Sequence, residues 1–228
     1  MKTTRRSTLA LSGAALLSVC ALASCATSRS DAPETVVWRL EQPGSVGGFT
    51  PEVLGSPKAR TVDGRKAVCF DGVADGLMIA TNPILGWPQY TVEVLIKPDG
   101  DGPVEQRYLH IQDEHERRLL LETRVTPQKS WALDTFLHAS PEHKLTQLDM
   151  NLLQPTDRWY WTSLVYDGKA MSQYVDGVKL LEGPVAVPPM TEGKISLGVR
   201  QNRVSWFKGC IAEVRFVPSA AAPRSSLR

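Results

Sequence analysis

The sequence has 228 residues and little net charge, with a formal value of +2 at pH 7. It lacks a basic cluster interleaved with aromatic side chains, so we expect no nucleic-acid partner. It also has no Cys/His spacing typical of zinc, no glycine-rich phosphate loop and no Gly-x-Ser-x-Gly nucleophile motif. These absences exclude several enzyme classes, while a hydrophobic content of 42% excludes an intrinsically disordered chain.

The N-terminal segment has the pattern of an export signal. A basic start at Lys2, Arg5 and Arg6 precedes an apolar stretch over residues 9–23. A spanning helix needs about 20 apolar residues, so a secretory signal over residues 1–24 is favoured over a retained anchor helix. The start also resembles a twin-arginine export motif, and an ordinary basic start is the alternative.

The signal ends in Leu-Ala-Ser-Cys, which matches the cleavage box of bacterial lipoproteins. Cys25 is therefore the predicted lipidation site. We expect an exported lipoprotein held at a membrane on the periplasmic or cell-surface side. Removal of residues 1–24 takes away three cations and no acid, so the formal charge falls from +2 to −1. Residues 25–35 are small and polar and predict a flexible tether, and residues 219–228 predict a flexible tail.

The remaining chain, residues 36–218, has the pattern of an all-β domain. Asp-Gly occurs seven times and supplies the positive φ that tight hairpin turns require. Short runs with a period of two lie at residues 90–96, 161–166, 172–175, 194–199 and 212–216. The pattern predicts an antiparallel sandwich or barrel. Helix has little support, because even residues 113–121 contain a Leu-Leu-Leu run that fits a buried strand better.

Blocks of sequence in a fixed order resemble a laminin G-like domain of the concanavalin A-like lectin/glucanase superfamily. They are Phe70-Asp71-Gly72, residues 90–94, residues 157–168, Tyr174-Val175-Asp176-Gly177, residues 195–198 and residues 207–216. The resemblance implies a two-sheet antiparallel jelly-roll sandwich with one concave sheet. It implies binding of glycans or proteins, sometimes with calcium, and some relatives are hydrolases or lyases.

Two departures from the family pattern bear on function. The family usually has an aromatic residue where Leu95 stands, so a flat platform for a sugar is not expected at that point. No Glu-x-Asp-x-x-Glu stretch, as in glucanases of this fold, is present either, which argues against glucanase activity.

The middle strands are unusually polar and predict a ligand site. Alternation places Gln106, Tyr108, His110 and Gln112 on one face. It also groups Arg118 with Glu122 and Arg124, and Asp134 with Phe136 and His138. If these strands are neighbours, the rows meet on the concave sheet. The loop at residues 200–203 adds two arginines beside a tryptophan, which can clamp an acidic or sugar ligand. The predicted ligand-binding residues are Arg107, His110, Glu122, Arg124, Asp134, His138 and Arg200.

Two alternatives to a binding site remain open at this point. One is a solvated sheet face with cross-strand ion pairs. The other is lyase chemistry on an acidic polysaccharide, for which His110, Tyr108 and Arg124 have suitable side chains. Their spacing matches no lyase signature, so we assign no catalytic residue.

Four aspartates in Asp-Gly turns raise the question of calcium. Asp71, Asp75, Asp99 and Asp101 offer carboxylate oxygens of the kind that calcium prefers. Turn formation explains the same residues without a metal, so structural calcium is not favoured and no metal or cofactor is predicted.

The mature domain contains two cysteines besides Cys25, namely Cys69 and Cys210. An oxidising compartment favours a disulfide between them, and the resemblance implies neighbouring terminal strands. Alternation argues against it: it sends Cys69 outward and Cys210 inward, unless a bulge at Gly209 reverses the second assignment. A disulfide and two separate thiols are both left open.

The function expected from these observations is a non-catalytic, lipid-anchored module that binds a glycan or a glycosylated envelope partner. The first alternative is a polysaccharide-cleaving lyase or hydrolase that uses the polar residues of the concave sheet. The second is a structural lipoprotein that contacts other envelope proteins.

Overall fold

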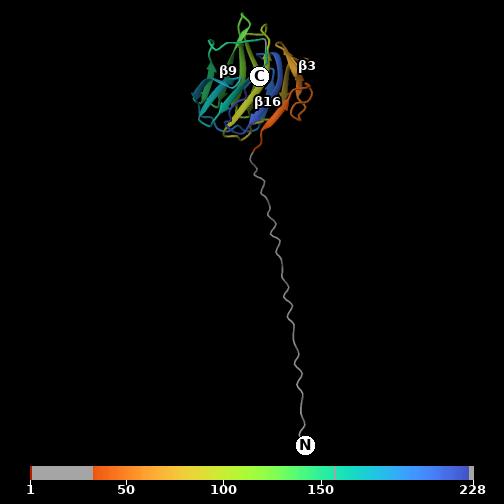
Figure 1. The fold of residues 1–228 in the computed structure, drawn as a ribbon. Helices are drawn as coiled ribbons and strands as arrows, with labels where there is room; N and C mark the ends of the chain where they lie inside the picture. The colour runs from red at the N-terminus through yellow and green to blue at the C-terminus, as the bar shows by residue number, and fades with distance from the viewer. Residues whose placement is uncertain (2–32, 157, 226–228) are drawn as a thin grey trace. The chain divides into compact units, whose positions relative to one another are not determined.

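The structure, a computed structural model, describes Met1, residues 33–156 and residues 158–225 (Figure 1). The predicted signal, Cys25 and most of the predicted tether lie outside the described residues. Residues 33–225 belong to one compact unit. In this described part the chain forms strands and no helix, and therefore no helix long and apolar enough to cross a membrane occurs there.

Within the described residues, sixteen strands form two antiparallel sheets of eight. In the first sheet the order is β14 (Val178–Pro184), β13 (Ala170–Val175), β12 (Tyr160–Tyr166), β6 (Tyr90–Pro98), β16 (Lys208–Val217), β4 (Arg65–Asp71) and β3 (Lys58–Val62), with β1 (Val36–Arg39) also paired to β16. In the second sheet the order is β10 (Lys144–Leu148), β9 (Ser130–His138), β8 (Arg118–Val125), β7 (Glu105–Asp113), β15 (Gly193–Leu197), β5 (Gly76–Ile79) and β2 (Glu52–Leu54), with β11 (Gln154–Pro155) also paired to β9. The predicted all-β, two-sheet antiparallel sandwich is confirmed.

Two hairpins turn on Asp-Gly pairs, as the sequence predicts. Asp63 and Gly64 connect β3 to β4 with φ values of 50° and 75°. Asp176 and Gly177 connect β13 to β14 with φ values of 50° and 77°. Positive φ at both central residues is the geometry of a tight hairpin turn, and a glycine adopts it without steric cost.

The core lies between the two sheets and is built from their alternating inward residues. The second sheet contributes Leu109, Ile111, Leu119, Leu121, Val125, Trp131, Leu133, Leu137, Ile195 and Leu197. The first sheet contributes Val68, Phe70, Val92, Val94, Ile96, Tyr160, Leu164, Tyr166, Ile211, Val214 and Phe216. All of these side chains are buried, so the outward residues of each strand are free to take other roles.

A second apolar cluster lies apart from this core. Its members are Ala67, Leu95, Trp159, Trp161, Cys210 and Ala212, all from the first sheet or the segment leading into it. Leu95 pairs with Trp161 across β6 and β12. The position that lacks the family's usual aromatic therefore belongs to the first sheet, not to the sheet that carries the polar strands.

A disulfide joins Cys69 on β4 to Cys210 on β16, with 4.0 Å between their Cα atoms. The predicted inward orientation of Cys210 is wrong, because a bulge shifts the alternation between Ile211 and Glu213. Cys210 precedes the bulge and belongs to the second cluster, whereas Val214 follows it and belongs to the core. The bulge that changes the alternation of inward and outward side chains therefore lies at Ala212 and not at Gly209, the position considered from the sequence.

The segment predicted as a flexible tail makes contacts with β6 in its described part. The Thr91 hydroxyl donates to the Ser219 carbonyl at 2.9 Å, and the Ala221 N–H lies 3.0 Å from the same hydroxyl oxygen. The Arg224 N–H donates to Glu93 Oε1 at 2.7 Å. The Arg224 guanidinium lies 5.2 Å from the ring centroid of Trp161, so the segment lies over one indole of the second cluster.

Candidate functional site

A pocket of about 260 Å³ lies on the outer face of the second sheet. Strands β7 to β10 and the loop after β15 supply its lining, which consists of Arg107, Arg118, Leu120, Glu122, Arg124, Asp134, Phe136, Thr146 and Arg200. Four arginines, two carboxylates, an aromatic ring and a leucine thus meet in one depression. A pocket with a few convergent polar groups beside apolar surface is typical of a small-ligand site.

Strand β8 supplies four of the lining residues through regular alternation. Leu119, Leu121 and Val125 point into the core. The residues that alternate with them, at positions 118, 120, 122 and 124, point outward and line the pocket. The prediction that Arg118, Glu122 and Arg124 share one face agrees with this arrangement.

Strand β7 departs from the predicted alternation. A register shift between Arg107 and Leu109 marks a bulge at Tyr108. Tyr108 turns into the core, where its hydroxyl donates to Thr162 Oγ1 at 2.9 Å. The prediction that Tyr108 shares a face with His110 is wrong for this reason. The bulge instead places Arg107 opposite Glu122, so that the arginine reaches the pocket.

Strand β9 completes the floor through its register with β8. Glu122 lies directly opposite Asp134, Leu120 opposite Phe136, and Arg118 opposite His138. Directly opposed residues have Cβ atoms roughly 4.5–5.5 Å apart. The predicted row of Asp134, Phe136 and His138 is therefore brought beside the outward residues of β8.

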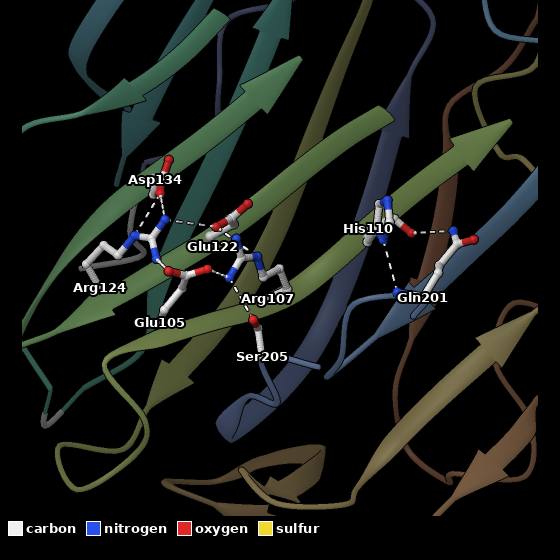
Figure 2. Close-up of polar contacts among 8 residues, drawn as sticks. All are labelled: Glu105, Arg107, His110, Glu122, Arg124, Asp134, Gln201 and Ser205. Carbon is white, nitrogen blue, oxygen red and sulfur yellow. Dashed lines mark hydrogen bonds and ion pairs between the residues drawn. The ribbon is translucent and has the colours of Figure 1, made fainter. Parts of the chain in front are cut away.

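An alternating chain of charges crosses these strands (Figure 2). Arg124 Nε and Nη2 lie 2.8 and 2.5 Å from Asp134 Oδ2, and its Nη1 lies 2.5 Å from Glu105 Oε2. Glu105 also pairs with Arg107, whose Nε lies 3.0 Å from Glu122 Oε2. Arg107 further donates to Ser205 Oγ at 2.8 Å. Two arginines and three carboxylates therefore fix one another, as the ion-pair alternative proposes.

Burial raises the pKa values of two carboxylates in this chain of charges, Glu122 and Asp134. Burial, reinforced by the neighbouring charge of Asp134, raises the pKa of Glu122 to about 7. Burial also raises the pKa of Asp134, although Arg124 opposes the shift. The two carboxylates repel one another across the strands, so Glu122 holds its proton up to near neutral pH.

His110 lies along the same face but does not line the pocket (Figure 2). Its Nδ1 accepts the Gln201 N–H at 3.1 Å, and the Gln201 side chain donates to the His110 carbonyl at 3.2 Å. Burial and the nearby positive charges of Arg200 and Arg118 lower the pKa of His110 to about 3. The imidazole is neutral at physiological pH and holds the loop that carries Arg200.

Five of the seven predicted ligand-binding residues line the pocket: Arg107, Glu122, Arg124, Asp134 and Arg200. His138 does not; it stacks on Phe136 with 5.8 Å between ring centroids. Sequence reasoning did not assign Leu120, Phe136, Thr146 or Arg118 to the site. Alternation along β8 and β9 indicates that Arg118, Leu120 and Phe136 share the outward face with the predicted residues. Thr146 lies on β10, a strand that the sequence does not predict.

Three of the four aspartates considered for calcium contact other groups of the described protein. Asp71 Oδ1 accepts three backbone N–H groups from residues 73–75, and Asp75 Oδ1 accepts the Ser56 N–H at 2.6 Å. Asp101 pairs with Lys208 at 2.8 Å. Within the described residues no group of three or more His, Cys, Asp or Glu side chains is arranged to hold a metal ion.

Solved structures share this fold at low sequence identity. Domain 4 of AbnA, an extracellular GH43 arabinanase from Geobacillus stearothermophilus solved with arabinotriose, is 19% identical with a TM-score of 0.62, and the match covers 82% of this chain and 93% of that one. The receptor binding domain of botulinum neurotoxin D is 12% identical with a TM-score of 0.61, and the binding domain of Paraclostridial Mosquitocidal Protein 1 is 9% identical with a TM-score of 0.62. Each of these two matches covers 82% of this chain. It covers about half of the other chain, 50% for the neurotoxin domain and 49% for the mosquitocidal protein domain.

A search among curated proteins finds no similar sequence. A laminin G-like family model, described as the concanavalin A-like lectin/glucanases superfamily, matches residues 71–224. The matched region contains strands β5 (Gly76–Ile79) to β16 and every residue that lines the pocket. The two-sheet architecture and this match together identify the chain as a member of the concanavalin A-like lectin/glucanases superfamily.

Proposed function

We propose that this protein is a non-catalytic glycan-binding module whose site is the pocket on the outer face of the second sheet. The observation that carries the proposal is the combination of planar charged groups with Leu120 and Phe136 in one depression. Sugars present hydroxyls to such planar donors and acceptors and a C–H face to an aromatic ring. The AbnA domain, which shares the fold, was solved with arabinotriose, and this supports the same class of ligand here.

A solvated face with ion pairs explains part of this surface. The charge chain is present, but it does not require Leu120 and Phe136 to point outward beside it. Leu120 is buried, but Phe136 is partly exposed, and a face that only needed to be soluble would place a polar residue at position 136. The partly exposed ring therefore favours a ligand-binding role for the face.

The test of this proposal is Phe136→Ala on a glycan array. We expect the full chain to bind a subset of glycans and the variant to bind them about 5-fold to 30-fold more weakly, because an aromatic platform contributes roughly 1–2 kcal/mol. Phe49→Ala is the matched control, since Phe49 is a partly exposed aromatic residue outside the pocket lining. Equal affinities of the wild type and both variants would contradict the placement of the site.

A second candidate function is glycan cleavage, which one observation favours. Glu122 has a pKa of about 7 and lies opposite Asp134, and a raised carboxyl pKa beside a second carboxylate is a feature of general acids. The pairing of both carboxylates with arginines argues for a structural role instead. Incubation with the glycans that bind, followed by assay of new reducing or unsaturated ends, separates the two functions.

We also propose that Cys25 carries a lipid that holds the module at a bacterial membrane, on the periplasmic or cell-surface side. The cleavage box at the end of the signal supports this, although it lies outside the described residues. Two or three acyl chains anchor a protein firmly, because each buried CH₂ contributes about 0.8 kcal/mol. A glycosylated envelope protein at that membrane is the alternative source of the glycan.

The anchor predicts a simple partition experiment. The exported wild-type protein should enter the detergent phase, and Cys25→Ser should leave unlipidated precursor that does not. Wild-type protein that is exported and recovered without detergent would contradict the lipid anchor.

A further inference from the structure

Two of the four pocket arginines have no carboxylate partner in the described part of the chain. Arg107 and Arg124 are each paired with two or more carboxylates. Arg118 and Arg200 line the same pocket, but neither forms an ion pair with a described residue. The positive charge of this end of the pocket is therefore not compensated from within the described protein.

The surroundings of both arginines favour an anionic ligand. Arg118 Nε is buried and has no hydrogen-bond partner among the described residues. Burial and the positive charges of Arg107 and Arg118 lower the pKa of Arg200. Buried donors in native proteins almost always have a partner, and like charges gather where a ligand of opposite charge binds.

An unpartnered acceptor lies in the same pocket. Asp134 uses Oδ2 for both contacts with Arg124, and its Oδ1 is buried without a partner in the described part of the chain. A carboxylate oxygen accepts a hydrogen bond from a hydroxyl group but repels an anion. The groups of this pocket are therefore complementary to a ligand that carries one anionic group and also hydroxyl donors. An acidic sugar has both.

We propose that the pocket recognises an acidic glycan, whose carboxylate binds between Arg118 and Arg200 while a hydroxyl donates to Asp134 Oδ1. This inference rests on the proposed glycan-binding function and adds the charge class of the ligand. Guanidinium groups match a carboxylate with two parallel hydrogen bonds, and such charge-assisted pairs are the stronger ones. Leu120 and Phe136 lie opposite each other between Arg118 and Asp134, so the partly exposed Phe136 is placed to stack on the sugar ring.

Paired glycans test the charge class directly. The array carries uronic-acid-containing and sialylated oligosaccharides beside their carboxyl-reduced, neutral counterparts. We expect the full chain to bind acidic members at least about 10-fold more tightly than their reduced forms, because a charge-assisted hydrogen bond contributes enough for one or two decades of affinity. The acid that binds best then serves as the probe for the variants.

Arg118→Gln and Arg200→Gln should each weaken binding of that acid about 10-fold to 100-fold. Lys194→Gln is the matched control: it removes one cation from β15, outside this pocket, and should leave binding within about 2-fold since exposed charges act weakly at physiological salt. Thermal melting of each variant reports folding. If Arg118→Gln does not fold, Arg200→Gln and the charge-conserving Arg118→Lys carry the test.

The outcomes separate the two proposals. Equal binding of acidic and carboxyl-reduced glycans overturns the acidic ligand and leaves the glycan-binding function intact. Acidic binding that both glutamine variants retain at full strength overturns the assignment to Arg118 and Arg200. Binding to no glycan of either charge contradicts the proposed function itself, and the inference with it.

Discussion

Replacing Cys69 and Cys210 together by alanine is expected to lower the free energy of unfolding by about 5 kcal/mol. The disulfide closes a loop with a sequence separation of 141, and in the chain-entropy model a loop of that length gives about this stabilisation. Both cysteines line a surface pocket and Cys69 is only partly buried, so the smaller side chains leave little additional enclosed cavity. Urea unfolding of the oxidised wild type and the double variant measures the difference.

Reduction of the wild type provides the control for this result. Reduced wild type and the double alanine variant should have nearly the same free energy of unfolding, because both lack the same cross-link. A double variant within about 1 kcal/mol of the oxidised wild type would contradict a disulfide that staples β4 to β16.

Replacing Arg124 by alanine is the second large effect, with an expected loss of about 3–5 kcal/mol. Arg124 contacts Glu105, Glu122 and Asp134, and the side chains of the last two are only 4% and 2% exposed. Removal of the cation leaves the buried Asp134 without an ion-pair partner among the described residues and leaves Glu122 with Arg107 alone. An uncompensated buried charge costs much more than the pair contributes. Thermal or urea unfolding near neutral pH measures the loss.

Arg203→Ala is the matched control for that variant. Arg203 pairs with Glu52 at 2.8 Å, but both side chains are more than half exposed. An exposed ion pair contributes at most about 1 kcal/mol, so this variant should be nearly as stable as the wild type. Equal losses in the two variants would show that the charge chain on the second sheet is not a buried network.

The loss in Arg124→Ala should depend on pH in a defined direction. The folded-state pKa values of Glu122 and Asp134 lie above their ordinary values, and removal of Arg124 raises them further. The folded variant then binds protons more tightly than the unfolded chain, so its stability falls as the pH rises from about 4.5 to above 7, beyond the range over which the wild type responds. The deficit relative to wild type is therefore largest above that range and shrinks in acid.

Regular alternation made much of the site predictable. The outward positions of β8 carry Arg118, Glu122 and Arg124, and those of β9 carry Asp134, Phe136 and His138, as their period of two indicates. The Asp-Gly pairs at residues 63–64 and 176–177 likewise mark hairpins, because their backbone needs positive φ. These features depend on neighbours in sequence, so local chemistry determines them.

Bulges explain the two orientations that the sequence did not predict. One extra residue at Tyr108 in β7 and one at Ala212 in β16 reverse the alternation beyond them. Neither tyrosine nor alanine is a residue type that indicates a bulge in the sequence. The register of the partner strands determines where the extra residue falls. The orientations of Tyr108 and Cys210 therefore followed from pairings far away in the sequence.

The charge chain and the unpartnered arginines were also beyond local reasoning. Glu122 meets Asp134 because β8 and β9 pair in one register, and Arg200 reaches the pocket from a loop anchored on His110 through Gln201. Residue types alone left a binding site and an ion-pair face as alternatives. The structure pairs Arg107 and Arg124 with carboxylates, whereas Arg118 and Arg200 have no carboxylate partner among the described residues.

The position of the glycan site is tested most directly by a map of amide chemical shifts during titration with a glycan that the array identifies. If the pocket on the second sheet is the site, the perturbed amides cluster on β7, β8 and β9 around Arg118, Leu120 and Phe136, and in the loop that carries Arg200. Perturbations confined to the first sheet around the second apolar cluster, with the β8 and β9 amides unchanged at saturation, would show that the glycan does not bind in this pocket.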